Sequence, residues 1–386
     1  MKLKKDITFI YMDSAEKSMF MPVLEEAKLR GYTAKMTNNP FEKCEIGVYC
    51  QHINFPQYSK FSVITLHDII QQYGNWPDIW FREPWNKYDV GILPSNQWVK
   101  NWKQCSQWYY TRPKRGMYLA GWPKADSVAK IQQNSYREEF FEKYHLDPNK
   151  RTVLYAPAWE NDGKQDDFVK AMLPLNVNIL IKQYDADPEK FPDVVKNVRE
   201  MYELHKDMPE VTILPPSTNI FHAIAVSDIL VSEESSTMAE AVMMGVPAIS
   251  VSDWLIPDVT PSRYPECSYT FVILTKKKEL SACVKEILAN YDKYKEETQK
   301  ASAEHFSNVG KTSSIIMDII DDCVANKQIR YAPITIERKE PVPFMKNIKH
   351  LLLQFRVAMF SNYSKRYKVI AVFWNGLKKA KNALVK

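Results

Sequence analysis

The stretch that decides the fold is Ser227-Asp-Ile-Leu-Val-Ser-Glu-Glu-Ser-Ser-Thr-Met-Ala-Glu-Ala-Val-Met-Met-Gly-Val-Pro-Ala-Ile-Ser250. It begins with an apolar strand, Ile229–Val231, which leads into a turn rich in hydroxyl groups. A helix is predicted to open at about Ser236, and Gly245-Val-Pro ends it before the next strand. This order of strand, turn, helix and strand is typical of a parallel α/β sheet.

The turn is a candidate site for the phosphate groups of a nucleotide. A helix N-terminus offers free N–H groups and partial positive charge, and Ser235, Ser236 and Thr237 add hydroxyl donors. Glu234 stands beside them, and Glu240 lies about one turn into the helix, where its carboxylate would accept hydrogen bonds from a ribose. The alternative is that the serines only cap the helix. Three hydroxyls beside two carboxylates favour the ligand site.

Short apolar runs alternate with helix-like stretches along most of the chain. The first set comprises Ile7–Tyr11, Ile46–Tyr49, Ser62–Leu66 and Val90–Leu93, and the second comprises Thr152–Ala156, Val177–Ile181, Val211–Leu214, Ile229–Val231 and Ala248–Val251. A polar stretch at 145–150 separates the two sets. The pattern predicts an α/β protein with two Rossmann-like domains, residues 1–147 and 148–325, that face a cleft. Ligands are expected at the carboxyl ends of the strands.

Composition excludes several other classes of protein. A chain of 386 residues with 45% hydrophobic and 25% charged residues is typical of a globular protein rather than a disordered one. Its six cysteines are scattered without metal-binding spacing, which predicts neither a disulfide framework nor a metal cluster and fits a reducing cytoplasm. The apolar run Ile7–Met12 is too short for a signal peptide or a membrane span.

The net charge of +6 is concentrated at the end of the chain. Residues 345–386 carry ten Lys or Arg and no Asp or Glu, which leaves −4 for residues 1–344. Apolar clusters alternate with the basic ones, as in amphipathic helices that lie on anionic membranes. We therefore expect a basic helical tail, 326–386, that binds an anionic membrane surface through 345–386. The alternative is a helix packed back on the domains, with its lysines in solvent.

Four segments follow one another along the chain: Gly121–Asp126, Val153–Trp159, Ile179–Lys182 and the 227–247 block. In this order they resemble the CDP-glycerol glycerophosphotransferase family of teichoic-acid and capsule synthesis. The resemblance covers roughly residues 60 to 325. It implies a glycosyltransferase-B fold whose C-terminal domain holds the nucleotide.

The same segments add candidate residues for the nucleotide donor. Pro157 and Trp159 belong to the second segment, Lys182 follows the third, and Lys124 stands where the family carries an Arg. Either lysine would neutralise diphosphate charge as the bond breaks. For each, a solvated surface lysine is an equally good interpretation.

The chain also departs from the family pattern. It has Glu160 where the family usually has an Arg, Gln183 where it often has a His, and Glu233 where it has an Asp. The segment around Glu240 is similar to the ribose motif of sugar-nucleotide glycosyltransferases. These differences leave the nucleotide donor open.

His67 is the candidate general base. It follows the strand Ser62–Leu66, as a His does in the family, and its ordinary pKa suits deprotonation of an acceptor hydroxyl. Asp68 would orient or tune the ring. The alternative is a loop histidine with local hydrogen bonds.

The stretch 76–108 is rich in aromatic residues, most of which are expected to fill a core. Arg82 is its candidate for supporting an anionic acceptor. Nucleic-acid binding is an alternative for such a mixture of aromatic and basic residues, but the acidic body argues against it.

These patterns predict a peripheral transferase on the cytoplasmic face of the membrane. It would move glycerol phosphate from CDP-glycerol to a hydroxyl of a lipid-linked glycan or polymer, releasing CMP, without a metal or other cofactor. Alternatives are a nucleotide-sugar glycosyltransferase of the same fold and a non-catalytic scaffold. Oligomeric state is unknown from these patterns.

Overall fold

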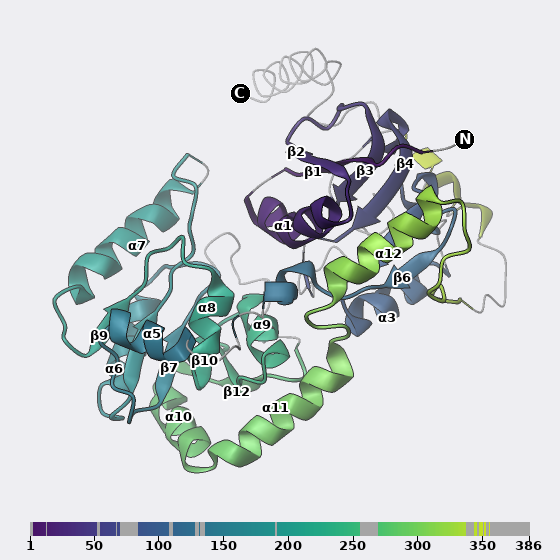
Figure 1. Cartoon of the computed structure of the whole chain (residues 1–386). Helices are drawn as coiled ribbons and strands as arrows, with labels where there is room; N and C mark the ends of the chain where they lie inside the picture. Colours follow the sequence, from purple (N-terminus) through teal and green to yellow (C-terminus); the bar gives the residue numbers. More distant parts are fainter. Residues whose placement is uncertain are drawn as a thin grey trace, which may run out of the picture. The chain divides into compact units, whose positions relative to one another are not determined.

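The computed structural model describes residues 3–12, 14–51, 55–66, 68–69, 84–107, 111–127, 131, 136–189, 191–254, 269–336, 343–345, 347–349, 351–352 and 355. Contacts divide the chain into two compact units (Figure 1). The first unit draws on residues 1–67, 75–124 and 312–386, and the second on 68–74 and 125–311. The predicted domain bounds at 147/148 and 325/326 differ from these divisions. Residues 125–147 group with the second unit, and a late helix, α12 (Thr312–Val324), groups with the first.

The first unit is built on a parallel sheet of six strands in the order β2-β1-β3-β4-β5-β6. Its central strands are buried because they are short runs of apolar residues between polar turns. The strands are β1 (Asp6–Ile10), β2 (Thr33–Thr37), β3 (Cys44–Cys50), β4 (Ser59–Thr65), β5 (Val90–Leu93) and β6 (Met117–Leu119).

Helix α12 returns to the first unit by packing beside α1 (Ser14–Leu29), as Figure 1 shows. Arg30, just after α1, fixes this contact. Its guanidinium donates to Asp318 at 2.6 Å and to Asp321 at 2.9 Å. The unit also contains α3 (Asn96–Cys105), η1 (Pro56–Tyr58), η2 (Trp85–Lys87) and part of η3 (Pro123–Ser127).

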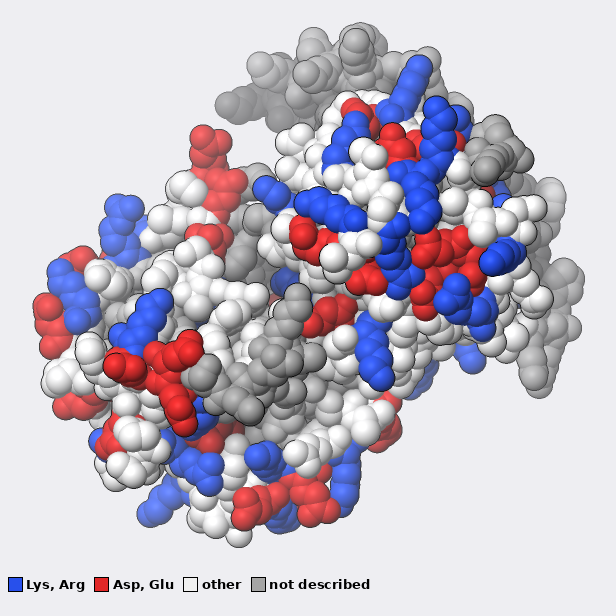
Figure 2. All heavy atoms as spheres, viewed as in Figure 1, with Lys and Arg blue, Asp and Glu red and all other residues white. Residues whose placement is uncertain are grey.

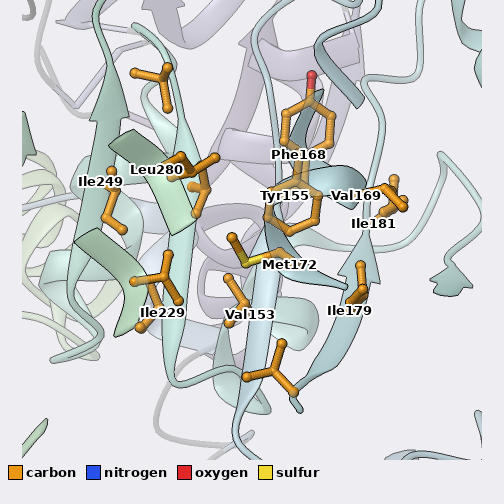
Figure 3. Close-up of a cluster of buried hydrophobic side chains, with 14 of the residues drawn as sticks. Val153, Tyr155, Phe168, Val169, Met172, Ile179, Ile181, Ile229, Ile249 and Leu280 are labelled. Carbon is orange, nitrogen blue, oxygen red and sulfur yellow. The ribbon is translucent and has the colours of Figure 1, made fainter. Parts of the chain in front are cut away.

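The second unit has its own parallel six-stranded sheet, in the order β12-β11-β10-β7-β8-β9. Figure 3 shows its core, in which Tyr155 stacks on Phe168 with ring centroids 5.2 Å apart. The strands are β7 (Thr152–Tyr155), β8 (Asn178–Ile181), β9 (Val211–Ile213), β10 (Ile229–Ser232), β11 (Ala248–Val251) and β12 (Ile273–Thr275).

The second unit also contains helices. They are α5 (Tyr136–Lys143), α6 (Lys164–Met172), α7 (Pro192–His205), α8 (Ile220–Ala225), α9 (Thr237–Met243), α10 (Leu280–Ala289) and α11 (Tyr291–His305), with η4 (Lys277–Glu279) before α10. Helix α9 begins directly after Ser236, where the sequence predicts a helix start.

The predicted α/β class with two Rossmann-like sheets is confirmed. All nine predicted strands are present within one to three residues of their expected ends. The sequence missed β2, β6 and β12, because β2 is a half-exposed edge strand with a polar pattern and the other two have three residues each.

No helix in the described part of the chain combines the length and hydropathy of a membrane-spanning segment. The face shown in Figure 2 carries acidic and basic side chains interspersed.

Candidate functional site

The second sheet reverses its strand order between β7 and β10. Successive strands from β7 to β9 run towards one edge, and those from β10 to β12 run towards the other. At such a point the loops after the two central strands run in opposite directions, and ligands of parallel α/β sheets commonly bind there. The turns that follow Tyr155 and Ser232 meet at this point, and they contain most of the predicted nucleotide-binding residues.

Glu233 joins these two turns. Its Oε1 accepts hydrogen bonds from the backbone N–H groups of Ala158, at 2.9 Å, and Trp159, at 3.2 Å. The ammonium of Lys164 lies 3.5 Å from the same oxygen and donates to the carbonyl of Trp159 at 3.1 Å. Glu233 and Lys164 are both buried, so this ion pair is internal.

Hydroxyl groups from β10 and α9 hold the same loop. Ser232 Oγ lies 2.8 Å from the carbonyl oxygen of Ala156 and 3.0 Å from Glu233 Oε2, so its single proton is shared between them. Thr237 Oγ1 donates to the Ala156 carbonyl at 3.1 Å. The turns after β7 and β10 are therefore one hydrogen-bonded assembly.

The predicted phosphate-binding turn is partly engaged within the chain. Ser235 Oγ accepts from the backbone N–H of Thr237 at 3.3 Å, which is a local turn bond between a serine and the backbone two residues on. Ser236 is the N-cap of α9 and is half-buried. Glu234 is half-buried and Glu240 is buried in α9.

Lys182 and Trp159 lie at the ends of β8 and β7. Lys182 is half-buried, and its ammonium donates to the carbonyl of Gln183 at 3.0 Å. The ring of Trp159 packs edge-on against Phe191, with centroids 4.8 Å apart, and lies beside Tyr184. Pro157, in the same loop, is buried.

A buried polar network lies at the same strand ends. Glu160 Oε2 accepts from Tyr155 Oη at 2.8 Å and from Gln183 Nε2 at 2.7 Å, and its Oε1 accepts from the backbone N–H of Gln165 at 3.2 Å. Gln183 Nε2 also donates to Gln165 Oε1 at 2.6 Å. The side chain of Gln165 continues the network to His205 Nδ1 at 3.0 Å.

The network holds a carboxylate in an unusual state. Glu160 is fully buried, and burial raises its pKa from 4.5 to about 7, although hydrogen bonds from Gln183 and Tyr155 act in the opposite direction. Gln183 Oε1 is also buried and has no hydrogen-bond partner in the described part of the chain. Such a group costs free energy unless water or a ligand pairs with it.

The structure does not bring all predicted site residues together. His67 and Arg82 lie outside the described residues. Asp68 is half-buried. Lys124, in η3, is half-buried, and its ammonium lies 5.9 Å from the ring centroid of Trp122. The residues of the second unit, by contrast, share the strand ends around β7, β8 and β10.

The prediction from sequence rested on the hydroxyls of the 233–237 turn and did not include Glu233 or Lys164 among the site residues. Glu233 could have been identified from the sequence, because it is a carboxylate in a turn that also contains three hydroxyl side chains. No local pattern marks Lys164, because its partner is 69 positions away. No group of three or more potential metal-binding side chains occurs among the described residues.

Two six-stranded parallel sheets, with a polar site at the reversal of the second, are the elements of a glycosyltransferase-B-type fold. A sequence profile of CDP-glycerol:poly(glycerophosphate) glycerophosphotransferases matches residues 80–322. Because the match spans more than half of the chain, the protein belongs to this family. A sequence search of curated proteins gives no significant match.

Solved structures support the fold. Wall teichoic acid polymerase TagF superposes with a TM-score of 0.59 at 15% identity, covering 85% of this chain and 91% of that chain. A structure of TagF soaked with CDPG superposes with a TM-score of 0.58 at 16% sequence identity. The match covers 84% of this chain and 90% of that chain. UDP-GlcNAc 2-epimerase from Neisseria meningitidis, bound to UDP-GlcNAc, superposes with a TM-score of 0.57 at 13% sequence identity. The match covers 82% of this chain and 100% of that chain.

Proposed function

We propose that the protein transfers a glycerol-phosphate unit from CDP-glycerol to a hydroxyl of a lipid-linked glycan or polymer, in wall teichoic acid or capsule synthesis. The family match over residues 80–322 carries this proposal. The similarity to TagF is consistent with it, because that protein is a teichoic acid polymerase and one of its structures was soaked with CDPG.

The nucleotide donor would bind where the second sheet reverses its strand order. Ser235, Ser236 and Thr237 would hold the diphosphate, with charge from Lys182 and, as the resemblance suggests, Lys124. Glu240 would accept hydrogen bonds from the ribose, with Glu234 nearby. Pro157 and Trp159 would form the opposite wall of the site.

His67 would remove the proton from the acceptor hydroxyl, assisted by Asp68, while Arg82 would support an anionic acceptor. The acceptor oxygen forms a bond to the β-phosphorus in line with the bond to the bridging oxygen, which breaks. CMP leaves with that oxygen and its electron pair. We propose that side chains and backbone dipoles supply the positive charge, so that no metal is required.

Membrane attachment through residues 345–386 is the second part of the proposal. Near the start of this segment, five apolar side chains are 60–74% exposed: Phe344, Met345, Leu351, Leu352 and Phe355. Exposed apolar residues next to basic ones suit an interface with anionic lipid. The protein would therefore act as a peripheral protein on the cytoplasmic face of the membrane.

A nucleotide-sugar glycosyltransferase is the second candidate. It is favoured by Glu160 and Gln183, which stand where the resemblance implies an Arg and a His and which are hydrogen-bonded to each other. The similarity in fold to an epimerase bound to UDP-GlcNAc is compatible with a sugar nucleotide.

A thermal-shift panel of CDP-glycerol, CDP-ribitol and UDP-sugars tests the proposal, because a ligand that binds only the native state raises the melting temperature. CDP-glycerol should give the largest shift, and turnover should release CMP. A nucleoside diphosphate as product would establish glycosyl transfer instead. Binding without turnover of any nucleotide donor would indicate a scaffold.

A further inference from the structure

The turn after β7 contains a ready anion-binding arrangement that the chain fills itself. The consecutive N–H groups of Ala158 and Trp159 and the ammonium of Lys164 all converge on Glu233 Oε1, at 2.9, 3.2 and 3.5 Å. Paired backbone N–H groups beside an ammonium are a common way to hold an anion. Here the anion is a carboxylate from the neighbouring strand.

Burial makes this contact strong. Glu233 is 3% exposed and Lys164 is 1% exposed, so neither charge is well solvated. A buried charge that loses its partner is much less stable than the intact pair. The carboxylate therefore has a strong preference for this one position, and so does the loop that it holds.

Glu233 is also fixed from its own side. Ser232 Oγ lies 3.0 Å from Glu233 Oε2, and Ser250 Oγ on β11 donates to the backbone carbonyl of Glu233. Glu233, directly after β10, is thus hydrogen-bonded to residues of β10 and β11. Its side chain links these strands to the 157–159 loop.

We propose that Glu233 is a positioning residue of the nucleotide-donor site, and that Lys164 is its internal counter-charge. Glu233 sets the distance between the loop 157–159 and the turn 235–237, which the proposed function makes the two walls of that site. The inference rests on the proposed function only for the identity of the ligand. The contact between Glu233 and the loop 157–159 does not depend on it. Glu233 need not touch the nucleotide.

We expect the length and the charge of the Glu233 side chain both to affect how firmly the loop 157–159 is held. Glu233→Asp installs the residue of the family pattern but shortens the reach to Ala158 and Trp159 by one methylene. Glu233→Gln keeps an oxygen that accepts from both N–H groups and removes the charge opposite Lys164. Glu233→Ala removes the contact entirely and leaves room for a small carboxylate.

Hydrogen exchange followed by mass spectrometry tests the contact without any nucleotide. In Glu233→Ala, the peptide spanning 156–162 should exchange faster, and formate should restore its protection by occupying the vacated position. The exposed Glu210, changed to Ala, is the matched control and should leave this peptide unchanged. Glu233→Gln should fall between wild type and Glu233→Ala, and it provides a folded variant if the alanine protein is unstable.

Kinetics with CDP-glycerol test the role. We expect KM for CDP-glycerol to rise about 10- to 100-fold in Glu233→Ala, with a smaller change in kcat and with rescue by formate. Unchanged exchange at 156–162 would overturn the inference, and so would faster exchange with an unchanged KM. Wild-type protein that does not turn over CDP-glycerol would count against the proposed function alone, because the exchange experiment would still decide whether Glu233 holds the loop.

Discussion

Gln183 donates a hydrogen bond to the buried carboxylate of Glu160, with 2.7 Å between Nε2 and Oε2. These residues are two of the departures from the family pattern, at positions where an Arg and a His are expected. The structure shows that they form one feature, because each supplies the group that the other requires. Neither is a source of positive charge for a diphosphate.

Glu160 and Gln183 should therefore be energetically coupled. Gln183→Ala removes a hydrogen bond to a buried carboxylate and should lower the free energy of unfolding by about 1–3 kcal/mol. In a Glu160→Ala background the same change should cost less, with a coupling energy of about 1 kcal/mol or more. Urea denaturation of wild type, the two single variants and the double variant measures this coupling energy. Additive effects would contradict the coupling, and Gln104→Ala, at an exposed position, is the control.

The pKa of Glu160 predicts a specific pH dependence of stability. Because folding raises this pKa from 4.5 to about 7, its contribution to stability is fully present below pH 4.5 and is lost as pH rises through 7. The loss corresponds to about 3 kcal/mol. Glu160→Gln cannot titrate, so its stability relative to wild type should increase by most of this amount, about 2.5 kcal/mol, between pH 5 and pH 8.

Chemical denaturation at several pH values tests this sign and size. The exposed variant Glu210→Gln should track wild type throughout. A difference between Glu160→Gln and wild type that stays constant from pH 5 to pH 8 would show that Glu160 has an ordinary pKa.

The hydrogen bonds of Arg30 should be the main polar interaction that stabilises the packing of α1 against α12. Arg30→Met keeps the apolar stem but removes the hydrogen bonds to Asp318 and Asp321, which should cost about 2–3 kcal/mol. Lys28→Met, which loses an exposed pair with Glu25, should change stability by no more than about 0.5 kcal/mol. Urea denaturation compares them, and equal effects would argue against this role of Arg30.

His67→Ala should reduce turnover about 10²- to 10⁴-fold, because the acceptor hydroxyl loses its base. The thermal shift caused by CDP-glycerol should be retained, since His67 is proposed to act on the acceptor. Release of CMP in the presence of acceptor measures the rate. Turnover that is unchanged in this variant would exclude His67 as the base.

The basic tail should bind anionic vesicles. Replacing Lys365, Arg366 and Lys368 by Glu should weaken binding by about 100-fold or more, at about 1 kcal/mol per basic residue. Vesicle sedimentation with and without phosphatidylserine measures the effect. Equivalent replacements of three exposed lysines in the second unit, Lys276, Lys278 and Lys285, should have little effect. Equal binding to neutral vesicles would contradict an electrostatic attachment.

Much of the fold was predictable because its strands are short apolar runs bounded by turn residues. The segment from Ile229 to Val251 is an example, since its strands and helix follow from local patterns alone. The packing of α12 on α1 was not predictable, because it depends on contacts of Arg30 with carboxylates 288 and 291 positions away.

The location of the site at the carboxyl ends of the strands was predictable from the sequence. Local chemistry pointed to the turn at 233–237, and the strand order places this turn beside the loop after β7. The roles of individual groups required coordinates. Thr237, expected to bind phosphate, donates to the Ala156 carbonyl, and Glu233 fills an anion site of its own chain. Such contacts join distant segments and leave no periodic signal.

A crystal structure with CDP-glycerol at saturating concentration is the most direct test of the central claim. Density for the diphosphate is predicted between the loop 157–159 and the turn 235–237, with the ribose near Glu240. A nucleotide bound at any other place, with these strand ends unchanged, would contradict the account.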